Sequence, residues 1–493
     1  MRIGIDFGTS YSAAGAMLDG KLELIRFGDE QQFRTTVYFP LKLPDVADFE
    51  LTPQLEAQVA RLLADSRREL GLAAARAAAA RKAALAEPAH RRAEALAMVP
   101  GVLARTDEEL RREAIKAVRR RWSSEQALLA VDSGVDLQNA LYGEDAIDAY
   151  VASGSGHLVV SPKSMLGYRL HGSARNTLLG IATHILGHIR STASRQLGAQ
   201  VRSAVLGRPV QFRSSMGEAG GVQAVEILTD AAHAAGFEAV EFLEEPAAAA
   251  IGFHRGERDQ RRTLVVDIGG GTTDVAIADV GGPAAAPRIL GSWGLAQGGT
   301  DVDIELSMRR FMPLFGKGST PTPVHQFYEA AAVHDLQRQA SFKRTAFQHV
   351  EAPFNTRLAQ LQAVGNTIRL NRAVERSKIQ LSEHANASMR LDYIEPGLEA
   401  QLDRAVLDES ASRFLSSLDA LLGTVESELA RPPEIIYLTG GMSRAPYVQR
   451  AVMAMFPGAE HVLGNASLGV VSGLAIAASI GYATPGPASE SDA

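Results

Sequence analysis

The segment with the clearest chemistry in this 493-residue sequence is a glycine turn that follows an apolar stretch and an aspartate. Residues 264–274 read Leu-Val-Val-Asp-Ile-Gly-Gly-Gly-Thr-Thr-Asp. Successive glycines let the backbone approach a phosphate closely and point its N–H groups at the oxygens, and the threonines add hydroxyl donors. Asp267, at the end of the predicted strand, can hold hydrated Mg²⁺. A simple tight turn remains an alternative interpretation of this motif taken alone.

The start of the chain offers the same chemistry a second time. Residues 6–10 read Asp-Phe-Gly-Thr-Ser, so two opposed turns can clamp a triphosphate and bring Asp6 and Asp267 near one metal ion. A third turn, at residues 438–444, also follows a predicted strand and suits close approach to a base or ribose. None of the three is a P-loop or a strand–GxGxxG unit, so those nucleotide-binding folds lack their fingerprints.

The elements around these turns are predicted to repeat. A strand, an aspartate, a glycine turn and a hairpin occur in residues 1–40 and again in residues 263–293. This weak duplication predicts an α/β fold of two similar lobes that face each other. Residues 53–130 differ, because Ala, Leu and Arg recur there at helical spacing, with breaks near Pro88 and Pro100.

Composition narrows the class of protein. The chain has no cysteine, which excludes disulfides, thiolate zinc sites and cysteine nucleophiles. An acidic residue at the sixth position leaves no room for a signal peptide, and no apolar stretch is long enough to span a bilayer, so we expect a cytoplasmic protein without membrane contact. The net charge is −6, yet residues 51–122 carry six more basic than acidic side chains. A solvated helix face is the simpler explanation of that excess, and attraction of an acidic partner is the other.

With these motifs in place, the sequence resembles the nucleotide-binding half of DnaK-type heat-shock chaperones, within the superfamily of actin-like ATPases. Among these it is most similar to the truncated YegD-like members. The resemblance extends from residue 1 to about residue 480 and depends on seven motifs in the right order. They are residues 6–12, 161–167, 244–249, 267–274, 298–303, 375–382 and 440–446.

The resemblance implies an ATPase that uses ATP or ADP and Mg²⁺. Asp6 and Asp267 would hold the Mg²⁺ through waters, with Glu245 in support. Lys163 would offset charge on the transferring phosphoryl group, and Asp267 would accept the proton of the attacking water, while Thr272 would assist. The residues that would contact the nucleotide are Gly8, Thr9, Ser10, Tyr11, Gly269, Gly270, Gly271, Thr272, Thr273, Gly298, Gly299, Glu375, Lys378, Ser382, Gly440, Gly441, Met442 and Arg444.

The sequence also departs from that family. Ile379 stands where these chaperones often have arginine, so affinity for the base or preference among bases is expected to differ. We expect a first lobe at residues 1–262 with a helical insertion at about 45–150, and a second lobe at 263–482 with a helical nucleotide-binding subdomain at about 304–400. A disordered tail is expected at 483–493. No interdomain linker or peptide-binding β-sandwich is recognised, so peptide holding is not carried over.

The function that follows is a chaperone-like ATPase switched by nucleotide, with a protein partner or client reached through the helical insertion. A filament or scaffold ATPase of the bacterial actin class, a small-molecule kinase of the same superfamily and a nucleotide sensor without turnover are the alternatives. Nucleic-acid binding is not expected, because the basic run at residues 119–121 has no interleaved aromatics and the chain is acidic overall.

Overall fold

A computed structural model describes residues 1–40, 49–86, 88, 91, 92, 96, 99, 105–133, 139–170, 172–284, 286–465 and 468–482. The chain forms two compact units: unit 1 comprises Met1–Tyr38 and Ala140–Ala493, and unit 2 comprises Phe39–Asn139. The expected tail at 483–493 and the expected break at Pro100 lie outside the described residues. Within the described part of the chain, no helix combines the length and apolarity that crossing a membrane requires.

The first sheet of unit 1 contains the N-terminal strand at its centre. Alternate residues of that strand, Ile3, Ile5 and Phe7, are fully buried, as expected for a strand packed between helices. The strand pairs antiparallel with the next strand along the chain and parallel with a later one, so the sheet is mixed. The strand order is β3 (Lys21–Leu24), β2 (Tyr11–Leu18), β1 (Arg2–Phe7), β8 (Ser203–Arg208) and β9 (Ala239–Glu244), with β4 (Gln32–Arg34) also on β2.

The second sheet repeats this arrangement. Its central strand, which leads to the second glycine turn, again pairs antiparallel with the following strand and parallel with a later one. Two mixed sheets of matching topology confirm the α/β fold with two similar lobes. The strand order is β12 (Arg288–Leu295), β11 (Thr273–Val280), β10 (Arg261–Ile268), β15 (Ile435–Thr439) and β16 (Glu460–Leu463).

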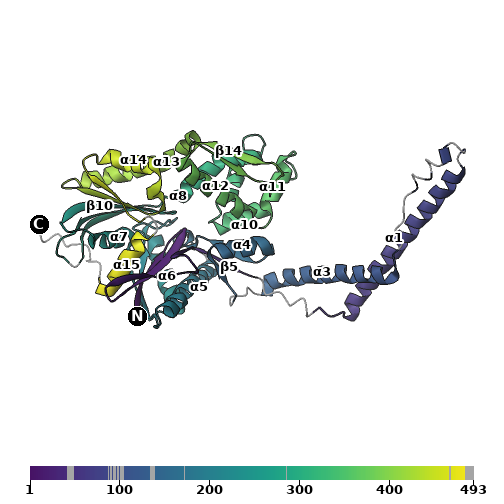
Figure 1. Cartoon of the computed structure of the whole chain (residues 1–493), viewed down its shortest axis with the longest axis horizontal. Helices are drawn as coiled ribbons and strands as arrows, with labels where there is room; N and C mark the ends of the chain where they lie inside the picture. Colours follow the sequence, from purple (N-terminus) through teal and green to yellow (C-terminus); the bar gives the residue numbers. More distant parts are fainter. Residues whose placement is uncertain are drawn as a thin grey trace. The chain divides into compact units, whose positions relative to one another are not determined.

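Two helices lie between the two sheets. They are α7 (Glu245–His254) and α15 (Gly469–Ile480), which pack on each other, on β1 and on β10 (Figure 1). Their sequences suit this place, because α7 has four consecutive buried alanines at residues 247–250 and α15 is apolar around nearly its whole circumference. The two lobes therefore share one apolar layer, and the ends of β1 and β10 lie on the same side of it.

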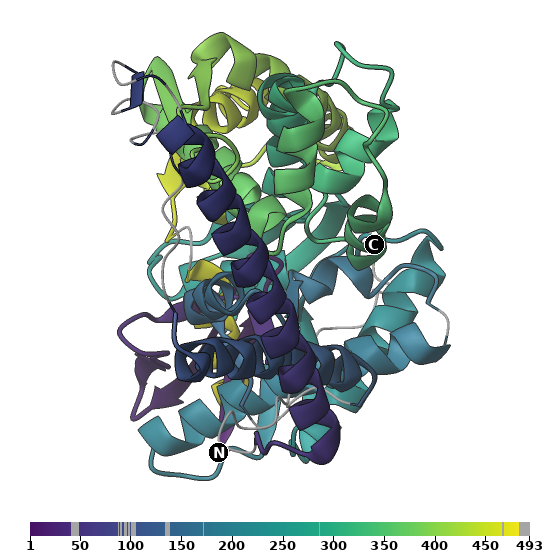
Figure 2. The same cartoon turned by 90° about the vertical axis from the view of Figure 1, so that its right-hand side faces the viewer.

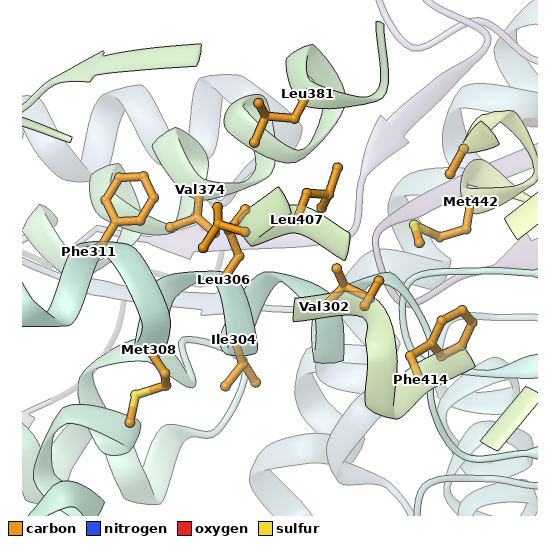
Figure 3. Close-up of a cluster of buried hydrophobic side chains, with 14 of the residues drawn as sticks. Val302, Ile304, Leu306, Met308, Phe311, Val374, Leu381, Leu407, Phe414 and Met442 are labelled. Carbon is orange, nitrogen blue, oxygen red and sulfur yellow. The ribbon is translucent and has the colours of Figure 1, made fainter. Parts of the chain in front are cut away.

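A helical part of the second lobe is held by one large apolar cluster. Figure 3 shows side chains of this cluster, with Leu306 of α8 (Gly299–Leu306) close to Val374 of α12 (Asn366–Glu383) and Leu407 of α13 (Arg404–Glu428). This packing fixes the two helices that border the site described below. The other helices and strands of this part are α9 (Val324–Ala331), α10 (Leu336–Arg344), α11 (Phe354–Gln362), β13 (Asn386–Arg390), β14 (Glu399–Asp403) and α14 (Pro446–Met455).

Unit 2 contains two long helices, α1 (Pro53–Ala86) and α3 (Asp107–Ser133). Figure 2 shows α1 as one continuous helix. Val59 of α1 packs with Ala114 and Val118 of α3, and an ion pair of 2.5 Å joins Arg67 to Asp107. These pairings run in opposite directions along the two helices, which cross near their N-terminal parts and then diverge (Figure 1). We call this pair of helices the hairpin.

The second segment of unit 1 begins at Ala140. Three short strands, β5 (Thr36–Phe39), β6 (Leu141–Tyr142) and β7 (His157–Val160), form a small sheet next to the helix α4 (Gly143–Ser153). Two further helices, α5 (Gly172–Gln196) and α6 (Glu218–Ala234), pack together in the first lobe.

Candidate functional site

The main cavity of unit 1 has a volume of about 390 Å³ and is lined by residues from both lobes. It opens where β1, β10 and β15 end, because each of these strands runs into one of the three glycine turns. This is the place where parallel strands of an α/β sheet present their carboxyl ends, the usual position of a ligand site.

The floor of the cavity carries three carboxylates and one ammonium group. Asp6 and Asp267 are each the second-last residue of their strand, β1 and β10, Glu245 begins α7, and Lys163 comes from a short 3₁₀ turn at Pro162–Met165. The Lys163 ammonium forms an ion pair with the Glu245 carboxylate, and their side chains are only 4% and 9% exposed. The single ammonium cannot neutralise three carboxylates, so the floor has an excess of negative charge.

Burial and this excess charge raise the pKa values of the acid groups. Burial, together with the charge of Glu245, raises the pKa of Asp6 to about 7. The same two causes, with Asp274 and Asp6 adding to them, raise the pKa of Asp267 well above its ordinary value. Burial alone would lower the pKa of Lys163, but the carboxylates of Glu245 and Asp6 hold it above its usual range. A cation at this place would favour the ionised carboxylates.

The acid cluster fits hydrated Mg²⁺ better than a bare ion. Mg²⁺ usually keeps several waters and binds through one or two carboxylates plus phosphate oxygens. Among the described residues, no three His, Asp or Glu side chains converge closely enough to ligate a metal directly. Asp6 and Asp267 are therefore the residues that would hold Mg²⁺, through its waters.

The first two glycine turns meet across the cavity. A Cβ atom at Gly270 would collide with the hydroxyl of Ser10, and one at Gly271 would lie 2.6 Å from the hydroxyl oxygen of Thr9. The contact between the turns thus leaves little room for a side chain at either position. The backbone N–H of Thr300, at the start of α8, donates to the carbonyl of Gly270 at 2.8 Å and ties that helix to the second turn.

The far end of the cavity is formed by α12 and the third turn. The Lys378 ammonium donates to Asp303 at 2.9 Å and to the carbonyl of Gly299 at 3.2 Å, so it also holds the N-terminal end of α8. Ile379 lines this end and is 55% exposed. Met442 and Arg444 line it from the third turn.

Charged side chains from both lobes join beside the cavity. Arg34 of the first lobe donates to Glu375 of α12 at 2.9 Å, to Glu144 of α4 at 2.9 Å and to the hydroxyl of Tyr11 at 3.1 Å. Arg372 of α12 pairs with Glu144 as well. We call Arg34, Glu144, Arg372 and Glu375 the mouth clamp, because Glu375 and Tyr11 line the cavity that it borders.

Most residues predicted from the sequence lie on this cavity, and three do not. Thr273 is fully buried and donates to the carbonyl of Gln297 at 3.0 Å, and Gly298 packs beneath the second turn. The hydroxyl of Ser382 donates to the carbonyl of Lys378 at 3.1 Å. The predicted residues that line the cavity are Asp6, Gly8, Thr9, Ser10, Tyr11, Lys163, Glu245, Asp267, Gly269, Gly270, Gly271, Thr272, Gly299, Glu375, Lys378, Gly440, Gly441, Met442 and Arg444.

The sequence prediction missed several residues of the site. Thr300 and Asp303 line the cavity, and both belong to a motif that was recognised without a role being assigned to them. Asp274 lies behind the floor: its carboxylate accepts the backbone N–H of Val210, from the first lobe, at 2.6 Å. Burial and the charge of Glu245 raise the pKa of Asp274 to about 8. Its place as the last residue of the glycine motif was the available signal.

Comparison with known proteins agrees with this geometry. Residues 162–315 match the Hsp70 protein family. Chaperone protein DnaK 1 of Synechococcus sp. is 29% identical over 309 residues, which cover 61% of this chain and 35% of that protein. Chaperone protein dnaK3 of Synechococcus elongatus is also 29% identical over 309 residues, with the same coverage of both chains.

The match thus spans about a third of the length of these chaperones. What those proteins do as a whole is therefore not carried over from the comparison alone. The two mixed sheets, with α7 and α15 between them, are arranged as in the actin-like ATPase fold of that family. By sequence and by fold, the chain is similar to the nucleotide-binding region of the Hsp70 family.

Proposed function

We propose that this protein binds Mg-ATP and hydrolyses it, as a chaperone-like ATPase of the YegD-like kind. One observation supports the proposal most strongly: two glycine turns from separate lobes meet directly above a buried floor of Asp6, Lys163, Glu245 and Asp267. Backbone N–H groups of such turns bind phosphate oxygens, and the floor supplies the charged groups that phosphoryl transfer requires.

Each part of the site has a role in this proposal. The turns at Thr9, Ser10 and residues 269–272 would hold the phosphates. Lys163 would offset negative charge on the phosphoryl group that passes from ATP to water with ADP as the leaving group, and Asp267, with its raised pKa, would accept the proton of that water. Mg²⁺, when bound, would neutralise charge on the phosphate oxygens.

A nucleotide sensor without turnover is the second candidate, and one contact favours it. The Lys163 ammonium is committed to Glu245 in this structure, so it would have to leave that pair, or share it, to act on a phosphate. Binding without hydrolysis would follow if the pair persists with nucleotide in place.

Single-turnover hydrolysis of ATP separates the two candidates. Wild-type protein, Lys163→Ala and Asp267→Asn are first checked for ATP binding and then mixed with substoichiometric ATP and Mg²⁺. A positioned acid or base typically contributes about 10²–10⁴ in rate, so both variants should hydrolyse slower by such factors while still binding. Lys21→Ala and Asp29→Asn are matched controls, because both side chains are exposed and away from the cavity.

The outcomes are distinct. Wild-type protein that binds ATP without hydrolysing it would identify the sensor and remove the catalytic roles. Wild-type protein that binds no ATP would remove the site assignment altogether. We further propose that a protein partner or client binds unit 2 in the cytoplasm. The support for this is the surplus of basic over acidic side chains in residues 51–122.

A further inference from the structure

One arginine of the first lobe forms an ion pair with the second lobe. Arg213, which follows β8, donates to the carboxylate of Asp301 in α8, and the Nε atom of Arg213 donates to the carbonyl of Ala296 at 3.2 Å. The two charged side chains are 11% and 28% exposed, so the pair is partly shielded from water and salt. Neither Arg213 nor Asp301 is among the residues that line the main cavity. The contact therefore joins the two lobes outside the cavity.

The carboxylate of Asp301 is fixed to the second glycine turn. Its other oxygen accepts the backbone N–H of Gly298 at 2.8 Å and thereby caps the start of α8. The backbone N–H of Thr300 donates to the carbonyl of Gly270 at 2.8 Å, and a Cβ atom at Gly298 would lie 2.9 Å from that carbonyl oxygen. The start of α8 and the second glycine turn are thus packed directly on each other.

The backbone of Arg213 is fixed to the segment that carries Lys163. Ser214, the next residue, forms a parallel β-bridge with Gly167. A Cβ atom at Gly167 would lie 2.3 Å from the carbonyl oxygen of Arg213, so the two segments are in contact. Lys163 lies in the 3₁₀ turn at Pro162–Met165, just before Gly167. The side chain of Arg213 therefore connects the Lys163 segment of the first lobe to the second glycine turn.

We propose that Arg213 is a positioning residue, which fixes the second glycine turn relative to Lys163. With the ion pair in place, the phosphates held by that turn stay at one distance from the ammonium of Lys163. Without it, the start of α8 is no longer held by the first lobe, and the phosphates lose this alignment. The inference rests on the proposed nucleotide function, and it adds a first-lobe residue that belongs to none of the seven sequence motifs.

The test compares a ligand that has phosphates with one that has none. A fluorescent ADP analogue is bound to the full chain and displaced with ADP or with adenosine, and single-turnover hydrolysis of bound ATP is measured separately. A residue that only stabilises the fold would affect both ligands alike when it is removed, whereas a residue that positions the second glycine turn should affect ADP and leave adenosine unchanged.

Three variants and one control isolate the ion pair. Arg213→Gln removes the charge, and Arg213→Lys keeps the charge but not the forked geometry of the guanidinium. Asp301→Asn weakens the pair while its amide oxygen can still accept the N–H of Gly298. Arg175→Gln is the matched control, because Arg175 pairs with Asp230 at 3.1 Å within the first lobe and does not line the cavity. Trp293 fluorescence in a Trp122→Phe background shows whether unit 1 of each variant is folded.

We expect Arg213→Gln to weaken ADP binding roughly two- to thirtyfold, the usual range for residues that act on a ligand without touching it. Hydrolysis of bound ATP should slow by up to about 100-fold, the size of effect that a small misplacement of reacting groups produces. Arg213→Lys and Asp301→Asn should give smaller losses of the same kind. The double variant Arg213→Gln with Asp301→Asn should lose no more than Arg213→Gln alone, and Arg175→Gln should behave as wild-type protein.

Equal losses for ADP and adenosine would overturn the inference, and so would unchanged ADP binding in Arg213→Gln. Losses of Arg213→Gln and Asp301→Asn that multiply in the double variant would also contradict it. If Arg213→Gln does not fold, Arg213→Lys and Asp301→Asn decide by the same comparison of ligands. Wild-type protein that binds neither ADP nor the analogue would show that the proposed function has failed, and this inference with it. Wild-type protein that binds ADP without hydrolysing ATP leaves the binding comparison to decide.

Discussion

The ammonium of Lys163 and the carboxylate of Glu245 form an ion pair across 82 positions of sequence, and water reaches neither group freely. Each is the nearest opposite charge of the other in a floor that also contains Asp6 and Asp267. Removing one member of a buried pair leaves an uncompensated charge, which usually costs more than the pair contributes to stability.

Lys163→Met should therefore lower the free energy of unfolding of unit 1 by about 3–5 kcal/mol, because it removes the cation that the buried carboxylates of the floor share. Lys163→Gln should cost less, because its amide N–H groups can still donate a hydrogen bond to Glu245. Urea denaturation followed by Trp293 fluorescence, in a Trp122→Phe background, measures unit 1 separately from the hairpin. The double variant Lys163→Met with Glu245→Leu should recover most of the loss, since it removes both charges. A loss for Lys163→Met below about 1 kcal/mol, the range of exposed pairs, would contradict the buried pair.

The acid floor predicts an unusual dependence of stability on pH. The pKa of Asp6 is about 7 and that of Asp274 about 8, against an ordinary value of 3.8. Between the ordinary and the raised values the folded protein binds more protons than the unfolded chain, so its stability falls as pH rises. Without nucleotide or metal, unit 1 should therefore melt at a higher temperature near about pH 5.5 than near about pH 8.5.

Mg²⁺ alone should reverse this loss at the higher pH, because it favours the ionised carboxylates. Thermal melting with and without Mg²⁺ at both pH values provides the measurement, and Ca²⁺ serves as a comparison cation. Asp6→Asn should weaken both the pH dependence and the response to Mg²⁺. A melting temperature that rises from low to high pH without metal would show that the floor is not the dominant titrating group.

Arg34 should determine how long a nucleotide stays bound. It contacts α4 through Glu144 and α12 through Glu375, and its side chain is 14% exposed. Hydrogen bonds to charged groups contribute about 1.5–3 kcal/mol each, so Arg34→Ala should raise the dissociation rate of ADP at least about tenfold. Arg34→Lys should give an ADP dissociation rate between those of wild-type protein and Arg34→Ala. Its ammonium keeps the charge but cannot reproduce the forked geometry of the guanidinium.

Stopped-flow release of a fluorescent ADP analogue measures this prediction. Arg26→Ala is the matched control, because that arginine is exposed and it is its backbone N–H that donates to the side chain of Gln196. An unchanged rate in Arg34→Ala would mean that the clamp does not limit release.

The sequence could predict the glycine turns and their strands because the necessary signals are local. An apolar run, an aspartate and successive glycines, as in residues 264–274, constrain the backbone wherever they occur. The mouth clamp could not be predicted, since Arg34 and Glu375 lie 341 positions apart and only the packing of the two lobes brings them together. The contact of Ser382 is local but was not predicted: its hydroxyl donates to the carbonyl of Lys378 one helical turn earlier, and the motif that contains both residues does not indicate this hydrogen bond.

The residue at which the helical insertion ends is also difficult to predict from sequence patterns. Helical periodicity extends through α3 and again through α4, and the strand that separates them, β6, has only two residues. No pattern of that length distinguishes a strand from a loop. The pairing of Leu141 with Tyr38, a long-range feature, is what places α4 in unit 1.

Ile379 should limit the affinity for the base. It lines the far end of the cavity, is 55% exposed and provides no charge, whereas Arg444 lines the same end from the third turn. A guanidinium that stacks on an aromatic base typically contributes about 0.5–2 kcal/mol. Ile379→Arg should therefore tighten ATP binding by roughly two- to thirtyfold, as measured by calorimetric titration.

Two comparisons locate the origin of that gain. Leu463→Arg introduces the same charge at a position that is 56% exposed and not on the cavity, so it should leave ATP affinity unchanged. Ribose 5-triphosphate, which has the sugar and phosphates but no base, should bind wild-type protein and Ile379→Arg equally. Equal gains for ATP and for this base-free ligand would mean that the new arginine attracts phosphate at long range. The base would then lie elsewhere than against Ile379.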